Sequence, residues 1–306
     1  MKNDKLNILI FGAHPDDCDI KAGGLAALYA RQGHRVKFVS HTNGATGHHE
    51  IGGIELARRR YEEAQASGRA LGIAYQVLDN HTGELEPTVH YRKEVIRIIR
   101  DFEPDLVMSH RPNDYHPDHR YSAMLVQDAA YIVTVPNMCP LTDHLTTNPV
   151  MMYLSDNFQK PNPFEPDVVV DIDDVIEQKV EALHCHTSQM YEWLPYNGGV
   201  LDDVPKDEGK RKIWMAERRL KAFEATANKY RDRLVALYGR AHGQKVKYAE
   251  AFEVCEYGSS LTDERRKEFF PFLSEHSVKR KKTKKSKKTK KSKKAKKSKK
   301  SKKSKR

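Results

Sequence analysis

Two short clusters of histidine and aspartate offer the side chains that bind metal ions and move protons. They are Ala13-His14-Pro15-Asp16-Asp17 and Asp114-Tyr115-His116-Pro117-Asp118-His119. His14 and Asp17 are three residues apart, so one turn of the chain can direct both side chains at one point. Either cluster alone could simply cap a neighbouring helix. Together they offer a His/Asp/His set with carboxylates left over, which is typical of a catalytic zinc that keeps one position for water.

Each cluster follows an apolar segment that reads as a buried strand. Residues 6–13 and 106–109 are apolar runs of the kind found in strands covered on both faces. Over 54–71 the apolar residues recur three and four apart, which predicts a helix. Further strands are predicted at 36–40, 75–78, 150–154 and 167–172, and further helices at 23–31, 91–102, 117–132, 174–186 and 220–237.

The alternation of strands and helices indicates an α/β fold. We expect a Rossmann-like, mostly parallel sheet with helices on both faces, in which ligands bind at the carboxyl ends of the strands. Both clusters would then lie at that edge of the sheet. Residues 1–278 are predicted to form one domain, with a core over 6–190 and a helical C-terminal part over about 206–255.

Charge is unevenly distributed along the 306 residues. The segment 279–306 contains 20 of the 54 Lys and Arg residues and no acidic residue, so residues 1–278 carry about −8 although the whole chain carries +12. The segment repeats Lys-Lys-Ser/Thr/Ala and is predicted to be disordered. It could bind nucleic acid or another polyanion without sequence preference, or act only as a solvated extension. The net charge therefore does not make residues 1–278 a nucleic-acid-binding domain.

The cysteines and the hydropathy pattern indicate the compartment. Cys18, Cys139, Cys185 and Cys255 are far apart and form no Cys-x-x-Cys pair. This spacing argues against a disulfide framework or a structural zinc site and favours a reducing, cytoplasmic location. No apolar run approaches the ~20 residues that a membrane-spanning helix needs. The sequence is compatible with a homo-oligomer.

The two clusters together resemble the PIG-L/LmbE family of zinc-dependent N-deacetylases. The resemblance covers about residues 6–190 and extends more weakly to about 255. It implies removal of an acetyl group from an N-acetylglucosamine-type amino-sugar derivative, with Zn²⁺ as the metal and Fe²⁺ as the alternative. Smaller matches are Gly23-Gly24, Thr42-Asn43-Gly44, Arg60, Glu63-Ala64, Leu71-Gly72 and His186-Thr187-Ser188-Gln189.

The resemblance also implies roles for individual residues. An amide is a poor electrophile, and a metal ion polarises its carbonyl and acidifies water. Asp16 corresponds to the general base that takes the proton of this water. His116, held by Asp118, corresponds to the group that stabilises the oxyanion. The implied metal ligands are His14, Asp17 and His119, and the expected substrate-binding residues are Asn43, Arg60 and Gln189.

A few positions depart from the family pattern. Cys18 and Asp19 stand where many members have a glutamate, and Lys21 stands where small residues are common. Asp19 keeps a carboxylate but with a shorter reach. Cys18 is expected to pack in the core rather than to react.

Other functions stay open on the sequence alone. Two histidines and one carboxylate also bind iron(II) in oxygenases, although those sites usually carry His-x-Asp on antiparallel strands. A polyanion-binding protein that acts through 279–306 is the third hypothesis. Arg60 lies in a run of three arginines and could belong to a solvated basic face. His110 is the alternative third ligand, and His184 and His186 are expected to cap or pack.

Overall fold

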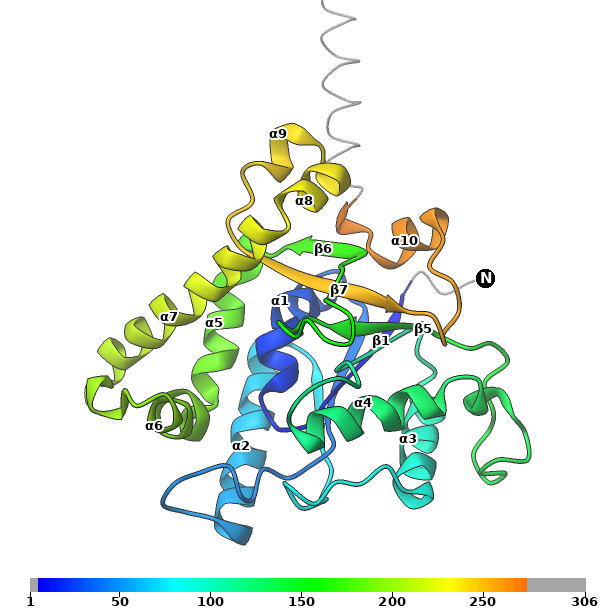
Figure 1. Cartoon of the computed structure of the whole chain (residues 1–306), viewed down its shortest axis with the longest axis horizontal. Coiled ribbons are helices and arrows are strands. Elements are labelled where there is room, and N and C mark those ends of the chain that lie inside the picture. Colours follow the sequence, from blue (N-terminus) through cyan, green and yellow to red (C-terminus); the bar gives the residue numbers. More distant parts are fainter. Residues whose placement is uncertain (1–4, 274–306) are drawn as a thin grey trace, which may run out of the picture.

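The computed structural model describes residues 5–273 (Figure 1). The Lys-rich segment 279–306 lies outside the described residues, and so do its predicted disorder, its polyanion contact and the domain boundary at 278. The expected α/β fold is confirmed. Its strands are β1 (Asn7–Gly12), β2 (Arg35–Ser40), β3 (Ala74–Val77), β4 (Leu106–Ser109), β5 (Val150–Leu154), β6 (Val168–Asp171) and β7 (Ala249–Cys255). Its helices are α1 (Asp17–Arg31), α2 (Gly53–Leu71), α3 (Val89–Phe102), α4 (Pro117–Ala129), α5 (Ile176–Cys185), α6 (Leu194–Asn197), α7 (Glu208–Lys229), α8 (Arg231–Tyr238), α9 (Arg240–Gly243) and α10 (Asp263–Phe269).

The strands form one seven-stranded sheet in the order β3-β2-β1-β4-β5-β7-β6. The first five strands in this order are parallel to one another, and Ile8 of β1 lies between Val36 of β2 and Leu106 of β4. The chain adds β2 and β3 on one side of β1 and then crosses to add β4 on the other side. Such a reversal of strand order leaves a crevice at the carboxyl ends of the two strands, where ligands bind in open α/β sheets.

Helices cover both faces of the sheet (Figure 1). Because side chains alternate along a strand, Ile8 and Ile10 of β1 share a core cluster with α1, α2 and α5. Leu9 and Phe11 share the opposite cluster with α3 and α4. All four side chains are fully buried, and burying one of this size stabilises the fold by ~1.5–3 kcal/mol. The packing fixes β1, and with it the loop that carries the first cluster.

Helices α7, α8 and α9 occupy most of the C-terminal part predicted as helical, but the structure differs from the prediction in two places. The region predicted as helical to about 255 contains β7, which inserts antiparallel between β5 and β6. Its Glu250 is buried and pairs with Lys179, so the strand lacks the apolar alternation that would reveal it. The helix predicted over 220–237 is two helices, α7 and α8, because the backbone leaves helical geometry at Tyr230 (φ −110°, ψ 30°).

The four cysteines are free thiols in the structure. Cys18 is buried with its Sγ against the Ile10 carbonyl oxygen, which confirms its packing role. Burial raises the pKa of the Cys18 thiol, so it stays protonated and unreactive. Within residues 5–273 no helix is long and apolar enough to cross a membrane.

Candidate metal centre

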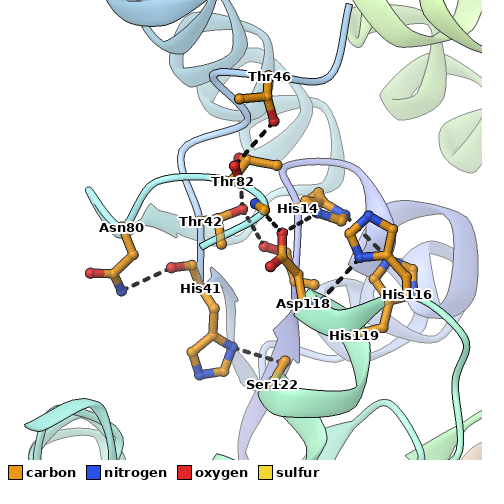
Figure 2. Close-up of polar contacts among 12 residues, drawn as sticks. His14, His41, Thr42, Thr46, Asn80, Thr82, His116, Asp118, His119 and Ser122 are labelled. Atoms are coloured by element: carbon orange, nitrogen blue, oxygen red, sulfur yellow. Dashed lines mark hydrogen bonds and ion pairs between the residues drawn. The ribbon is translucent and has the colours of Figure 1, made fainter. Parts of the chain in front are cut away.

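The two clusters meet at the ends of β1 and β4, where the strand order reverses (Figure 2). After β1 the chain turns so sharply that a Cβ at Gly12 would lie 2.9 Å from the Asp17 Cβ. This turn starts α1 at Asp17 rather than at the predicted Gly23. On the other side, α4 begins at Pro117, whose fixed φ suits a first helical turn, with His116 as the N-cap.

The ligand atoms of His14, Asp17 and His119 converge. His14 Nδ1 lies 3.2 Å from His119 Nε2 and 3.6 Å from Asp17 Oδ2, and His119 Nε2 lies 3.5 Å from Asp17 Oδ2. A tetrahedral zinc ion with bonds of about 2.1 Å holds its ligand atoms about 3.4 Å apart. The donor types and their spacing therefore fit one divalent metal ion.

Carboxylates orient both histidines from behind. Asp118 Oδ2 lies 3.0 Å from His14 Nε2 and accepts the Gly83 N–H at 2.7 Å. Asp114 Oδ2 lies 3.0 Å from His119 Nδ1. Each contact keeps a proton on the outer ring nitrogen and leaves the lone pair of the inner nitrogen for a metal. Sequence reasoning assigned Asp114 no role, although its place in the second cluster was a signal for one.

The centre favours positive charge. Burial opposes the protonation of His14, yet Asp118 and Asp17 raise the pKa of this ring to about 9. Burial also opposes the ionisation of Asp17, but His119 and His110 hold the pKa of this carboxyl well below its usual range. A bound cation would satisfy the same carboxylates, because a metal competes with protons for such ligands.

His110 is a competing ligand. Its Nε2 lies 3.2 Å from Asp17 Oδ2, and its ring stacks on His119 with centroids 4.3 Å apart. Asp17, His110 and His119 thus form a second set with metal-ligand spacing. However, His110 Nε2 shares the Ala13 N–H, at 3.3 Å, with Asp17 Oδ2, at 3.0 Å, whereas Asp118 turns His14 Nδ1 toward His119. This difference favours His14.

Asp118 contacts His116 through its backbone N–H and not through its carboxylate. Asp118 is fully buried and its carboxylate contacts His14, while its backbone N–H donates to His116 Nδ1 at 3.2 Å. In neutral His116 the proton is therefore on Nε2. Burial and the neighbouring rings of His14 and His119 lower the pKa of His116, so it is a neutral donor at the edge of the centre. His14, His116 and His119 also lie within metal-ligand spacing.

Asp16 and Arg60 form a buried pair beside the centre. Arg60 Nη2 lies 3.2 Å from Asp16 Oδ1 and donates to the Pro15 carbonyl oxygen at 3.1 Å. Arg60 is only 2% exposed, so the alternative of a solvated basic face is wrong. It packs under the loop at Gly44, where a Cβ would come within 2.5 Å of the Arg60 Cδ. Only glycine permits this close approach.

The other two expected substrate-binding residues position the loop above Arg60. Asn43 Nδ2 donates to Asp79 Oδ1 at 3.0 Å. Gln189 Nε2 donates to the Gly47 carbonyl oxygen at 3.0 Å. Contact of Asn43, Arg60 or Gln189 with a substrate stays a prediction.

Buried polar side chains around Asp19 pack against α1 and hold it in place. Asp19 Oδ2 accepts the Tyr75 hydroxyl at 3.0 Å and lies 3.2 Å from His186 Nε2. His186 is fully buried, which confirms its packing role, and His184 Nδ1 lies 2.6 Å from the Tyr191 hydroxyl. The short carboxylate of Asp19 thus serves the support of the helix that carries Asp17.

A pocket of about 320 Å³ lies beside His110 and His119. Lys21 and Asp114 also line it. Burial lowers the pKa of Lys21, and the carboxylates of Asp17, Asp156 and Asp114 oppose this shift. The lysine that departs from the family pattern therefore borders the centre.

Comparisons with known proteins identify the family. Residues 9–130 match the family described as PIG-L: GlcNAc-PI de-N-acetylase. The diacetylchitobiose deacetylase of Thermococcus kodakarensis is 35% identical over 211 residues, which cover 63% of this chain and 76% of that protein. The 4-oxalmesaconate hydratase of Pseudomonas putida is 26% identical over 204 residues, which cover 64% of this chain and 79% of that protein.

Solved structures share the fold. The N,N'-diacetylchitobiose deacetylase from Pyrococcus horikoshii, complexed with its inhibitor MPG, gives a TM-score of 0.62 at 24% identity and covers 82% of this chain and 84% of that chain. At this identity the likeness speaks for the fold alone. The sequence match to the Thermococcus protein goes further, and with the family match over 9–130 it shows that this chain belongs to the PIG-L family.

Proposed function

We propose that this chain is a metal-dependent N-deacetylase that removes an acetyl group from an N-acetylglucosamine-type amino sugar. The observation that carries the proposal is the convergence of His14, Asp17 and His119 within 3.6 Å of one another, beside the buried Asp16. The 35% identity to a diacetylchitobiose deacetylase supports the substrate class. Residues 1–278 would act as one catalytic domain.

His14, Asp17 and His119 would hold Zn²⁺, with Fe²⁺ as the alternative ion for the same donors. When bound, such an ion acts as a Lewis acid that polarises the amide carbonyl and acidifies water. Asp118 and Asp114 keep the two histidine rings oriented through contacts of 3.0 Å.

Asp16 is the proposed general base. Arg60 holds its Oδ1 at 3.2 Å, and this charged contact orients the carboxylate. Asp16 accepts the proton of the attacking water and later returns it to the leaving amine. His116, whose Nε2 carries the proton, is the donor that stabilises the oxyanion.

Acetate release and metal content test this proposal. The purified chain should release acetate from N-acetylglucosamine or diacetylchitobiose, lose activity with a chelator and regain it with Zn²⁺ or Fe²⁺. His14→Ala should lose metal and activity together, whereas His110→Ala should retain the metal. A His14→Ala protein with full metal occupancy would falsify the ligand assignment.

A hydratase is the competing function, because the Pseudomonas putida relative is a 4-oxalmesaconate hydratase. The same preparation separates the two reactions. Water addition to an unsaturated dicarboxylate, without acetate release from any amino sugar, would replace the deacetylase proposal. The oxygenase hypothesis is not favoured, since the donors follow the parallel strands β1 and β4.

A further inference from the structure

A second pocket, of about 460 Å³, lies between α7, α6 and the π-helical turn η3 (Ser188–Trp193). One part of its wall is apolar and includes Met190, Pro195 and Trp214. The other part is basic and consists of Arg218, Arg219 and Lys221. Among the described residues that line this pocket, none is acidic. We call it the α7 pocket.

Helix α1 connects the α7 pocket to the metal centre. Ile20 of α1 packs against the cluster that includes Met190 and Met215, which line the α7 pocket. Ile20 directly precedes Lys21, and the proposed metal ligand Asp17 begins the same helix. Lys21 lines the pocket beside His119, and Arg219 lines the α7 pocket. Both pockets therefore adjoin α1 near Lys21.

The arginines of the α7 pocket are not neutralised. Arg219 Nη2 lies 3.3 Å from the Met190 Sδ, which is a weak acceptor. The Arg218 guanidinium lies 4.8 Å from the centre of the Trp214 ring. Within residues 5–273, neither arginine has a carboxylate at ion-pair distance, although Arg59 pairs with Glu192. Two guanidinium groups thus border the pocket without a carboxylate of the described residues at ion-pair distance.

We infer that the α7 pocket binds an anionic group, a carboxylate or a phosphate, carried on an apolar part of the substrate remote from its acetamido group. The inference rests on the proposed deacetylase function. A guanidinium binds either anion through two parallel N–H donors, and the Trp214 face offers apolar contact to the spacer. The acetamido end would lie at His14 and His119, with the anion beyond Lys21. A neutral disaccharide would leave these charges unused.

The substrate arm of the test uses three N-acetylglucosamine glycosides that differ only at the end of the aglycone. The aglycones are 4-carboxybutyl, 4-phosphonooxybutyl and 4-hydroxybutyl. The full chain should show a kcat/KM for at least one anionic glycoside about tenfold to a hundredfold above that for the neutral one, as expected for a charged hydrogen-bonded contact. Comparison of the two anionic glycosides identifies the anion. Equal rates for all three would overturn the inference and leave the deacetylase function standing.

The binding arm needs no turnover and so survives a failure of the deacetylase proposal. Calorimetry compares 4-phenylbutyrate, 4-phenylbutyl phosphate and 4-phenylbutanol on the full chain and on Arg219→Gln. The variant should bind the anionic probe about tenfold or more weakly and the alcohol equally, and Arg219→Lys should restore part of the difference. Every protein carries the same Lys-rich segment, so its contribution cancels.

Arg58→Gln is the matched control, because Arg58 is an exposed arginine of α2 outside the α7 pocket. It should bind all three probes like the unchanged chain. If Arg219→Gln does not fold, Arg218→Gln tests the same pocket and should weaken the anionic probe alone. Equal affinity of the unchanged chain and the folded variant for the anionic probe would overturn the inference.

Discussion

The metal centre and the Lys179–Glu250 pair are both buried groups of charges, but only the pair is closed. Glu250 accepts the N–H groups of Gly24 and Leu25, each at 2.7 Å, and Lys179 Nζ at 2.5 Å. Lys179 also donates to the Ile20 carbonyl oxygen at 2.8 Å. At the metal centre, in contrast, the donor atoms of two histidines and one aspartate face one another and adjoin a pocket.

The difference separates a structural use of buried charge from a chemical one. The pair ties α5 and β7 to the middle of α1, the helix that begins with Asp17. The approach is so close that a Cβ at Gly24 would lie 3.0 Å from the Glu250 Oε1. Both Glu250 carboxylate oxygens and the Lys179 Nζ are hydrogen-bonded within the pair or to the backbone of α1, so neither side chain is left to bind a ligand. At the metal centre the inner nitrogens of His14 and His119 face each other, and Asp17 Oδ2, which accepts the N–H groups of Ala13 and His14, lies within 3.6 Å of both nitrogens.

The largest expected effect comes from Asp16, on the chemical side of this comparison. Asp16→Asn should keep the metal and the fold, since the amide oxygen still accepts from Arg60. It should lower kcat by ~10²–10⁴-fold, because an amide cannot take the proton of water. Steady-state acetate release and metal analysis on the same sample measure this. Near-normal kcat with metal bound would make Asp16 structural and leave another carboxylate as the base.

Lys179→Met should lower the stability of the fold and leave the metal centre intact, which is the reverse of the effect expected for Asp16→Asn. It leaves Glu250 buried without its cation, and breaking a buried pair from one side costs about 3–5 kcal/mol in the free energy of unfolding. Urea denaturation measures this cost, while the metal content of the folded fraction should stay unchanged. The control is Lys212→Met, which breaks the exposed pair with Glu181 and should cost less than about 1 kcal/mol. If Lys179→Met lowered the free energy of unfolding by no more than Lys212→Met, the buried pair would not stabilise the fold.

The sequence predicted the part of the centre that depends on local pattern. The apolar runs of β1 and β4 are continuous, and the clusters follow them directly, so their meeting at one edge could be expected. Spacing cannot show that Asp118 serves His14, because the two residues are 104 positions apart and meet only through the sheet. Arg60 sits among three arginines and looks like a surface residue until the loop at Gly44 covers it.

The Lys179–Glu250 pair and the strand β7 that carries Glu250 were harder to predict, because the two partners lie far apart in the sequence. Glu250 gives β7 a charged residue at a buried position, and its partner Lys179 lies on another element, α5. A sequence pattern treats both residues as surface charges, since lysine and glutamate are almost never fully buried unless paired. Closed pairs therefore conceal secondary structure, whereas clusters of metal ligands reveal it.

His41 is a buried side chain that stays neutral near the end of β1, and the pH dependence of stability tests it. Burial lowers the pKa of His41 to about 4, while its contact with the Gly12 carbonyl oxygen opposes the shift. The unfolded chain, with a histidine pKa of about 6.5, takes up a proton that the folded chain does not. Stability contributed by this group is complete above about pH 6.5 and falls as the pH drops toward 4, by about 3 kcal/mol in all.

The check is urea denaturation at about pH 7 and pH 5 for the unchanged chain and for His41→Gln. The unchanged chain should lose about 2 kcal/mol more between these values than the variant, since each pKa unit is worth about 1.4 kcal/mol. Identical losses would mean that His41 protonates in the folded chain without penalty. Ser122, whose hydroxyl lies 2.8 Å from His41 Nδ1, would then be a sufficient partner for the charged ring.

Asp118 and Asp114 give the smallest expected effect and the most direct test of the boundary between the two uses of charge. Loss of a carboxylate behind a metal-binding histidine typically weakens metal binding by ~10–100-fold. Asp118 is fully buried and Asp114 is partly exposed, so Asp118→Asn should weaken binding more, because charges interact more strongly away from water. Competition with a chromogenic chelator measures both affinities. If Asp118→Asn instead left the affinity unchanged and destabilised the fold as much as Lys179→Met, then the Asp118–His14 contact would be a second closed pair, and His110 would replace His14 as the third metal ligand.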